Sequence, residues 1–299
     1  MKSYDRILQE LDKHLAFTPG FEGNGWFQVN GQTISADISQ NLSIESPFTF
    51  NYIDQRILHF TSLDSAIKIL GSKYIRASNL NSLNDKGELL HALELINSSS
   101  EVLYEIKKQS FVACFTPYPK DRKVSDLDFH WENYGNKKRG LAFEFEIIRT
   151  PLYPQYYSLS VNYLDKKEQS DLLTHLYNNP ASNVNLKALS PIFASIKSSV
   201  FNDESEVRLF AIKEGFEFDI ENMVGSRIGV MINDENIASY YLMLPFIFNN
   251  EQLDQYVVPL LRLKKIYFHR EVETNDGQEY LLNYILPLCD KNGINYEWI

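Results

Sequence analysis

The sequence contains few cysteines, and they do not form a pair at a functional spacing. Cys114 and Cys289 are the two cysteines among 299 residues, and they lie far apart in the chain. Without a Cys-x-x-Cys pair, neither a zinc ribbon nor a disulfide framework is expected. Both cysteines lie in apolar segments, which predicts buried free thiols in a reducing cytoplasm.

Long apolar runs are also missing from the sequence. No stretch approaches the ~18 consecutive apolar residues that span a bilayer. The opening residues 1–6 are not followed by the apolar region that a secretory signal contains. These absences predict a cytoplasmic protein without a membrane partner.

The sequence has fewer basic than acidic residues. Lys and Arg total 29 against 39 Asp and Glu, which gives a formal net charge of -10. Because phosphate contacts require an excess of Lys and Arg, this balance disfavours a protein that binds nucleic acid over its whole surface. An enzyme that meets nucleic acid through a local basic patch is still compatible with it. Hydrophobic residues make up 44% and charged residues 23%, as in a globular chain with a sizeable core.

The apolar pattern divides the chain into two parts. Residues 1–52 carry a helical repeat and then a glycine-punctuated stretch, and we interpret them as an N-terminal segment that packs on the main body. Residues 53–299 contain short strands and helices without regular alternation. This favours an α+β fold with mixed or antiparallel central sheets and flanking helices over a doubly wound α/β fold. Strands are expected at 56–60, 74–77, 111–115 (a central strand), 140–145, 157–161, 206–212, 227–231 and 265–268, and helices at 66–70, 89–106, 165–177, 186–200 and 275–288.

Polar groups gather near strand ends in four segments. The first is the strand that contains His59 and continues into the hydroxyl-bearing residues Thr61 and Ser62. These side chains are candidates for binding a ligand together. The alternative is that His59 is a satisfied histidine of the core or its rim.

The second segment is a polar loop that contains Asn84, Asp85 and Glu88. Asp85 and Glu88 are three residues apart, so they share a face if a helix has begun there. A binding role is therefore one interpretation. The other is that Asp85 caps the helix that follows.

The third segment, 130–140, is a polar loop that contains Trp131 and Tyr134. Aromatic side chains before a buried strand suggest a stacking surface, which would need the tyrosine ring rather than its hydroxyl. Residues 137–139, Lys-Lys-Arg, form the densest basic run and are suited to phosphate. The alternative is a solvated turn with Trp131 packed beneath it.

The fourth segment contains Glu204, Glu206 and Arg208. Alternate residues of a strand share one face, so the three side chains are expected side by side. Two carboxylates beside one guanidinium can shift each other's pKa. The alternative is an exposed charge ladder on an edge strand.

These four motifs, in this order, resemble the DUF2971 family of bacterial proteins, whose role is undefined. The matching elements are a His-aromatic-Thr-Ser strand, an Asn-Asp-x-x-Glu loop, Trp-x-x-Tyr before a Gly-led strand, and Glu-x-Glu-x-Arg. They begin here at His59, Asn84, Trp131 and Glu204. The resemblance covers about residues 56–290.

The layout is also similar to the His–Tyr–Glu class of ADP-ribosyltransferases, which includes mono-ADP-ribosylating toxins. That resemblance implies an ADP-ribosyltransferase-like fold and NAD as substrate. In it, His59 binds the NAD ribose, Tyr134 stacks on nicotinamide, Glu206 holds the nicotinamide ribose, and Glu204 engages the acceptor. It also implies an intracellular toxin or phage-defence effector that modifies protein or nucleic acid, with an antitoxin or another partner protein.

The other motif residues receive supporting roles under this resemblance. Two would help to bind NAD, Thr61 and Ser62. Five would bind substrate: Asn84, Asp85, Glu88, Trp131 and Arg208.

Two other functions stay open. Asp85, Glu88 and Glu206 with His59 would suit a metal-dependent hydrolase or nuclease. No recognisable ligand spacing predicts a metal site, however. The remaining possibility is a recognition module without catalysis, whose aromatic and acidic loops bind a partner protein.

Overall fold

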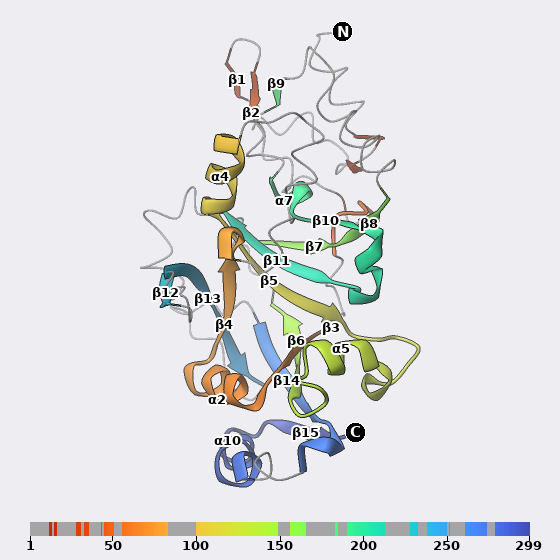
Figure 1. Ribbon diagram of the computed structural model, residues 1–299, viewed down its shortest axis with the longest axis vertical. Helices are drawn as coiled ribbons and strands as arrows, with labels where there is room; N and C mark the ends of the chain where they lie inside the picture. Colours follow the sequence, from red (N-terminus) through yellow and green to blue (C-terminus); the bar gives the residue numbers. More distant parts are fainter. Residues whose placement is uncertain are drawn as a thin grey trace.

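The computed structural model describes residues 12–13, 15–16, 28–30, 33–35, 43, 45–50, 56–82, 100–148, 156–165, 183–184, 190–212, 228–232, 238–249, 251, 261–273 and 279–299. Over these residues the protein has a mixed α+β fold, in which a large sheet is accompanied by few helices (Figure 1). Within the same ranges, no helix is long and apolar enough to cross a membrane.

The strands and helices follow one another without a repeating unit. The strands are β1 (Gln28–Asn30), β2 (Thr33–Ser35), β3 (Arg56–Thr61), β4 (Tyr74–Asn79), β5 (Ser110–Pro117), β6 (Leu141–Ile147), β7 (Tyr156–Ser160), β8 (Asn162–Leu164), β9 (Asn183–Val184), β10 (Ile196–Ser198), β11 (Val207–Ile212), β12 (Ile228–Ile232), β13 (Ala238–Phe248), β14 (Leu261–Phe268) and β15 (Asn295–Trp298). The helices are α2 (Leu63–Ser72), η3 (Leu80–Ser82), α4 (Ser100–Gln109), η4 (Val124–Asp126), α5 (Asp128–Asn133), α7 (Ser190–Phe193), η6 (Ser199–Glu204), η7 (Arg270–Glu273), the π-helix η8 (Leu281–Ile285) and α10 (Leu286–Asn292).

Among the described residues, ten strands form the main sheet. Its order is β12-β13-β14-β6-β3-β5-β11-β7, with β15 beside β14, and with β4 paired to both β13 and β5. Most neighbours are antiparallel, whereas β14 runs parallel to β13 and β15. The predicted mixed or antiparallel sheet is therefore confirmed. The central position predicted for 111–115 is confirmed too, because β5 pairs with β3, β4 and β11.

The two faces of the sheet carry different hydrophobic clusters. Alternation along β6 sends Leu141, Phe143 and Phe145 into the main cluster and Ala142 into a smaller one. We call these the first and the second face. On the second face, α5 covers β3 and β6 through the fully buried Trp131, whose indole nitrogen donates to the Val124 carbonyl over 3.0 Å.

Several predicted helices differ from the observed ones. The helix predicted over 66–70 spans Leu63–Ser72 and ends at Lys73 in a left-handed conformation, so Gly71 lies inside it. The helix predicted over 186–200 is wrong beyond Phe193, because residues Ile196–Ser198 pair with β8 as a strand. In the last predicted helix, residues 279–280 are α-helical, Leu281–Ile285 form a π-helix, and α10 continues to Asn292. The helix predicted over 165–177 lies almost entirely outside the described residues.

The segment 130–140 was expected to be a loop, which is wrong for its first part. Residues Asp128–Asn133 form α5. The chain then makes a left-handed turn in which Asn136, Lys137 and Lys138 have φ angles of 50°, 53° and 64°. Such angles are unfavourable for residues with a Cβ, and backbone hydrogen bonds such as Gly140 N–H to the Gly135 carbonyl, 2.9 Å, help to hold the turn.

This turn brings Gly140 against the end of β3. A Cβ built on Gly140 would lie 2.0 Å from the Thr61 carbonyl oxygen, which belongs to the rigid backbone of the sheet. The position therefore requires glycine because of close approach between two backbones.

We predict that Gly140→Ala destabilises the protein by ~1–3 kcal/mol, the usual range for forcing atoms into a filled space. Gly71→Ala is the matched control, because nothing lies within 4 Å of its added Cβ. In this helical position alanine should be neutral or stabilising by up to ~1 kcal/mol. Urea unfolding of both variants tests this. If Gly140→Ala were as stable as Gly71→Ala, the backbone of β3 at Thr61 would have to move away from the added Cβ at little cost.

Candidate functional site

The predicted Glu-x-Glu-x-Arg motif forms a buried ionic cluster where η6 meets β11. The expectation that all three side chains share one strand face is wrong for Glu204, because η6 ends at Glu204 and β11 begins at Val207. Between the two glutamates, Ser205 has a left-handed backbone with φ 43° and ψ 57°. Few residues other than glycine adopt this conformation, and it separates the end of η6 from the extended backbone of β11.

Glu206 and Arg208 form the centre of the cluster. The Arg208 Nε donates to Glu206 Oε1 over 2.7 Å, and its second terminal nitrogen donates to Oε2 over 3.1 Å. Arg208 is 1% exposed and also donates to the Ala194 carbonyl. The alternative of an exposed ladder on an edge strand is therefore wrong, since β11 lies between β5 and β7.

Lys197 joins the two glutamates. Its ammonium lies 2.6 Å from Glu204 Oε2 and 2.7 Å from Glu206 Oε2. Sequence reasoning missed this residue because it was assigned to a long helix. It lies instead on β10, whose pairing with β8 depends on residues about 34 positions earlier in the chain, such as Asn162 opposite Ile196.

Tyr134, the residue that follows α5, contacts the same cluster, and α5 packs against η6 (Figure 1). Its hydroxyl donates to Glu204 Oε1 over 3.1 Å, while the residue is 45% exposed. Burial of the hydroxyl raises the pKa of Tyr134, and the Glu204 carboxylate raises it further. The hydroxyl therefore stays protonated as a donor. Tyr134 was expected to act through stacking of its ring, and the structure adds a hydrogen bond from its hydroxyl to Glu204.

His130 and Tyr163 support the backbone on either side of Ser205, and sequence reasoning missed both roles. His130 Nε2 lies 2.7 Å from the Glu204 carbonyl and donates to it, because a carbonyl can only accept. Burial lowers the pKa of His130, which keeps the ring neutral. The Tyr163 hydroxyl accepts from the Glu206 N–H over 2.8 Å.

The cations keep Glu206 ionised in spite of its burial. Burial by itself raises the pKa of this carboxyl group, but the charge and hydrogen bonds of Arg208 outweigh it. Lys197 and a hydrogen bond from the Cys114 thiol lower the pKa further, to about 2. Glu206 is thus a carboxylate at every physiological pH.

Cys114 lies on β5 directly opposite Arg208 and is exposed. The prediction of a buried thiol is therefore wrong for Cys114, whereas it is confirmed for Cys289. The cause is alternation along β5: Ala113 and Phe115 face the main core, and Cys114 lies on the second face. The exposed thiol marks the accessible side of the Glu206 carboxylate.

His59 does not contact this cluster. It alternates with Ile57 of the main core, and its ring packs against Phe115 with 5.6 Å between centroids. Its Nδ1 lies 3.4 Å from the Cys114 carbonyl. Burial lowers the pKa of His59 and favours the neutral ring. Because Glu206 lies on the second face, the two side chains are on opposite sides of the sheet.

The other candidate residues either make structural contacts or lie outside the described residues. Thr61 is 8% exposed, and Ser62 caps α2 by accepting from the Ser65 N–H over 3.3 Å. Trp131 is buried as the anchor of α5. Three candidates lie outside the described residues: Asn84, Asp85 and Glu88. In the part of the chain that is described, no group of three His, Cys, Asp or Glu side chains could hold a metal ion.

No family model matches the chain, and searches of curated proteins and of solved structures find no significant similarity. The chemistry of the site is therefore argued from its own geometry. Its elements are two glutamates that share one lysine, a buried arginine, an exposed tyrosine and an exposed thiol.

We predict that Glu206 makes stability sensitive to acid. Its pKa falls from the ordinary value of 4.5 to about 2 in the folded protein, so ionised Glu206 stabilises the protein above about pH 4.5. This contribution is lost as the pH falls toward about 2, and it amounts to ~3 kcal/mol at ~1.4 kcal/mol per pKa unit. Urea unfolding between neutral pH and pH ~3 measures the first ~2 kcal/mol of this loss, since pH 3 lies ~1.5 pKa units below the ordinary value.

The comparison is with Glu206→Gln, whose free energy of unfolding should fall less steeply below about pH 5. Asp64→Asn is the control, because Asp64 forms an exposed ion pair with Lys68 at 2.6 Å. Exposed pairs of this kind contribute little to stability. Parallel pH profiles for wild type and Glu206→Gln would contradict the assignment.

Proposed function

We propose that the protein is an NAD-consuming ADP-ribosyltransferase in which Glu206 and Glu204 are the catalytic carboxylates. The observation that carries the proposal is the convergence of Tyr134, Glu204 and Glu206 on one partly open cluster. These are three of the residues that the resemblance to His–Tyr–Glu transferases selects. They lie directly after α5, at the end of η6 and directly before β11, so their meeting depends on how these elements pack.

Glu206 has the properties that this reaction requires. Cleavage of the bond between nicotinamide and ribose leaves an oxocarbenium-like cation on the sugar, and the bonding electron pair leaves with nicotinamide. A carboxylate that is already ionised and held in place stabilises that cation without reorganisation. The pKa of about 2 and the contacts of Arg208 supply both conditions.

A ribose hydroxyl can reach Glu206 from the side of Cys114. The carboxylate has about four acceptor positions, and its donors are two Arg208 nitrogens, Lys197 and the Cys114 thiol. The thiol is the weakest donor of these and is exposed. We propose that the ribose hydroxyl replaces it.

Glu204 and Tyr134 serve the acceptor in this proposal. Glu204 takes the proton that the acceptor group releases when it attacks the ribose carbon. The Tyr134 hydroxyl orients Glu204, and the exposed part of its ring stacks on nicotinamide. His59, which packs on the other face, supports β5 behind Cys114 rather than binding ribose.

The acceptor that the proposal favours is anionic. Lys137 and Arg139 are exposed in the turn that follows Tyr134. Two cations beside the site suit nucleic acid or an acidic protein segment, in a chain that is otherwise acidic. An intracellular toxin or phage-defence effector, acting in the cytoplasm and held by an antitoxin or another partner protein, is the biological role that fits.

The first test is Glu206→Gln. Loss of one preorganised electrostatic contact should reduce NAD cleavage per folded molecule by at least ~100-fold. Release of nicotinamide from labelled NAD in cell extract measures it, and circular dichroism gives the folded fraction. Asp64→Asn, on the distant surface of α2, should retain wild-type turnover. Retention of turnover by Glu206→Gln would remove this residue from the mechanism.

The second test separates the two roles of Tyr134. Tyr134→Phe keeps the ring but loses the bond to Glu204, and a hydrogen bond to a charged group corresponds to about a tenfold effect or more. Tyr134→Ala should lose more, because the stacking surface is removed as well. In the Glu204→Gln background, the Tyr134→Phe change should have little further effect. Independent, additive losses would show that the hydroxyl does not act through Glu204.

A further inference from the structure

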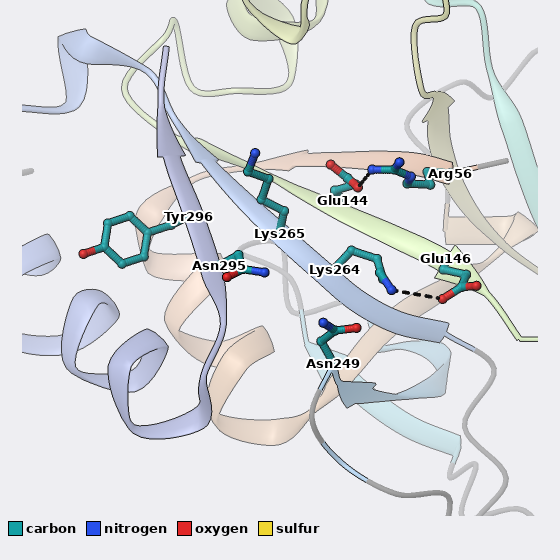
Figure 2. A pocket seen from close by; sticks show the side chains of 8 residues that line it. All are labelled: Arg56, Glu144, Glu146, Asn249, Lys264, Lys265, Asn295 and Tyr296. Carbon is teal, nitrogen blue, oxygen red and sulfur yellow. Dashed lines mark hydrogen bonds and ion pairs between the residues drawn. The ribbon is translucent and has the colours of Figure 1, made fainter. Parts of the chain in front are cut away.

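A second concave region lies away from the carboxylate cluster, at the edge of β14. It is a cavity of about 680 Å³, and Figure 2 shows the side chains around it. None of them belongs to the cluster at Glu206. The lining residues are Arg56, Glu144, Glu146, Asn249, Lys264, Lys265, Asn295 and Tyr296.

A β-bulge directs two lysines toward this cavity. Along the pair of β14 and β6, Leu263 is opposite Phe145 and Lys265 is opposite Glu144, so Lys264 is an additional residue without a partner in that register. In a regular strand, neighbouring side chains point to opposite faces. The bulge breaks the alternation, and both Lys264 and Lys265 line the same space.

The opposite edge of β14 is interrupted at the same residue. β13 pairs as far as Leu263, and β15 begins to pair at Lys265. Lys264 therefore lies in the gap between two parallel strands, with Asn249 and Asn295 on either side. Both amides can donate hydrogen bonds, so the gap presents donors together with a cation.

Arg56 adds a third cation whose counter-charge is buried. Its guanidinium donates to Glu144 Oε1 over 2.5 Å, and Tyr267 donates to Oε2 over 2.6 Å. Glu144 is 1% exposed, whereas the Arg56 side chain is 51% exposed. The carboxylate thus fixes the guanidinium from behind, and its other N–H donors are available on the open side.

Both lysines form ion pairs with partly exposed glutamates. Lys264 lies 3.5 Å from Glu146, and Lys265 lies 2.5 Å from Glu297; both glutamates are almost half exposed. Surface ion pairs of this kind contribute little, so a more highly charged anion can displace them. Glu297 and Arg262, whose terminal nitrogen also lies 3.5 Å from Glu146, belong to the same surroundings, so four cations and three carboxylates give a positive balance in an acidic chain.

We propose that this cavity binds the phosphate group of a small phosphorylated molecule. Arg56 provides a planar pair of donors, which suits phosphate oxygens, and the two lysines provide compact charges. The amides of Asn249 and Asn295, which line the same cavity, would contact the rest of the ligand. This proposal does not depend on NAD cleavage at the other site.

Calorimetric titration of the full chain with pyrophosphate at low salt tests the site. We expect saturable binding that Lys264→Met weakens by about tenfold or more, the usual consequence of losing one charge-assisted hydrogen bond. Lys68→Met is the matched control, because Lys68 is an exposed lysine on α2. Arg56 is unsuitable for the first test, since its removal would leave Glu144 buried without its cation.

A second variant keeps the outcome interpretable. Lys265→Met should also weaken pyrophosphate binding, and thermal unfolding of each variant shows that it is folded. No binding by the wild type, or equal binding by the wild type and both lysine variants, would overturn the proposal. Binding that is lost in Glu204→Gln but retained in Lys264→Met would assign the anion to the carboxylate cluster and would overturn it as well. Failure to cleave NAD would not affect any of these outcomes.

Discussion

The ion pair network around Lys197 is the interaction on which the candidate site depends. One ammonium holds Glu204 of η6 and Glu206 beside β11, and Arg208 neutralises Glu206 from within the sheet. Removing one member of such a buried network leaves an uncompensated charge, which commonly costs ~3–5 kcal/mol. The unusual backbone of Ser205 persists because contacts on both sides determine it, with His130 holding the Glu204 carbonyl and Tyr163 holding the Glu206 N–H.

A second buried carboxylate follows the same physical rule on the same face of the sheet. Leu58 belongs to the second-face cluster and is opposite both Glu144 on β6 and Thr116 on β5, so these two residues lie on the second face. Cys114 is two residues from Thr116 on β5 and therefore lies on the same face, as does Arg208, which is opposite Cys114. Glu144 is satisfied by Arg56 and Tyr267, much as Glu206 is satisfied by Arg208 and Lys197. Buried charges are retained where each oxygen has a donor.

The two regions differ in the freedom that their cations keep. At Glu206 the cations and the carboxylates are all largely buried, with the Arg208 and Lys197 side chains 1% and 12% exposed and the Glu206 and Glu204 side chains 7% and 16% exposed. At the cavity, Arg56 is half exposed and the lysines are about one-third exposed, so the cations there are accessible from solvent. One acidic chain therefore holds a buried, charge-balanced ionic cluster and, separately, a cavity lined by accessible cations.

The sequence by itself determined the local features. Apolar runs located β3, β5, β6 and β12, and the motif at 204–208 identified the ionic residues, because strand alternation and charge are properties of a few neighbouring residues. The tertiary structure decided the rest. Lys197 entered the site only because β10 pairs with β8, and Cys114 became exposed because one face of β5 is left open, while His59 was directed to the opposite face. Such outcomes depend on contacts between residues far apart in the chain, and local propensity does not encode them.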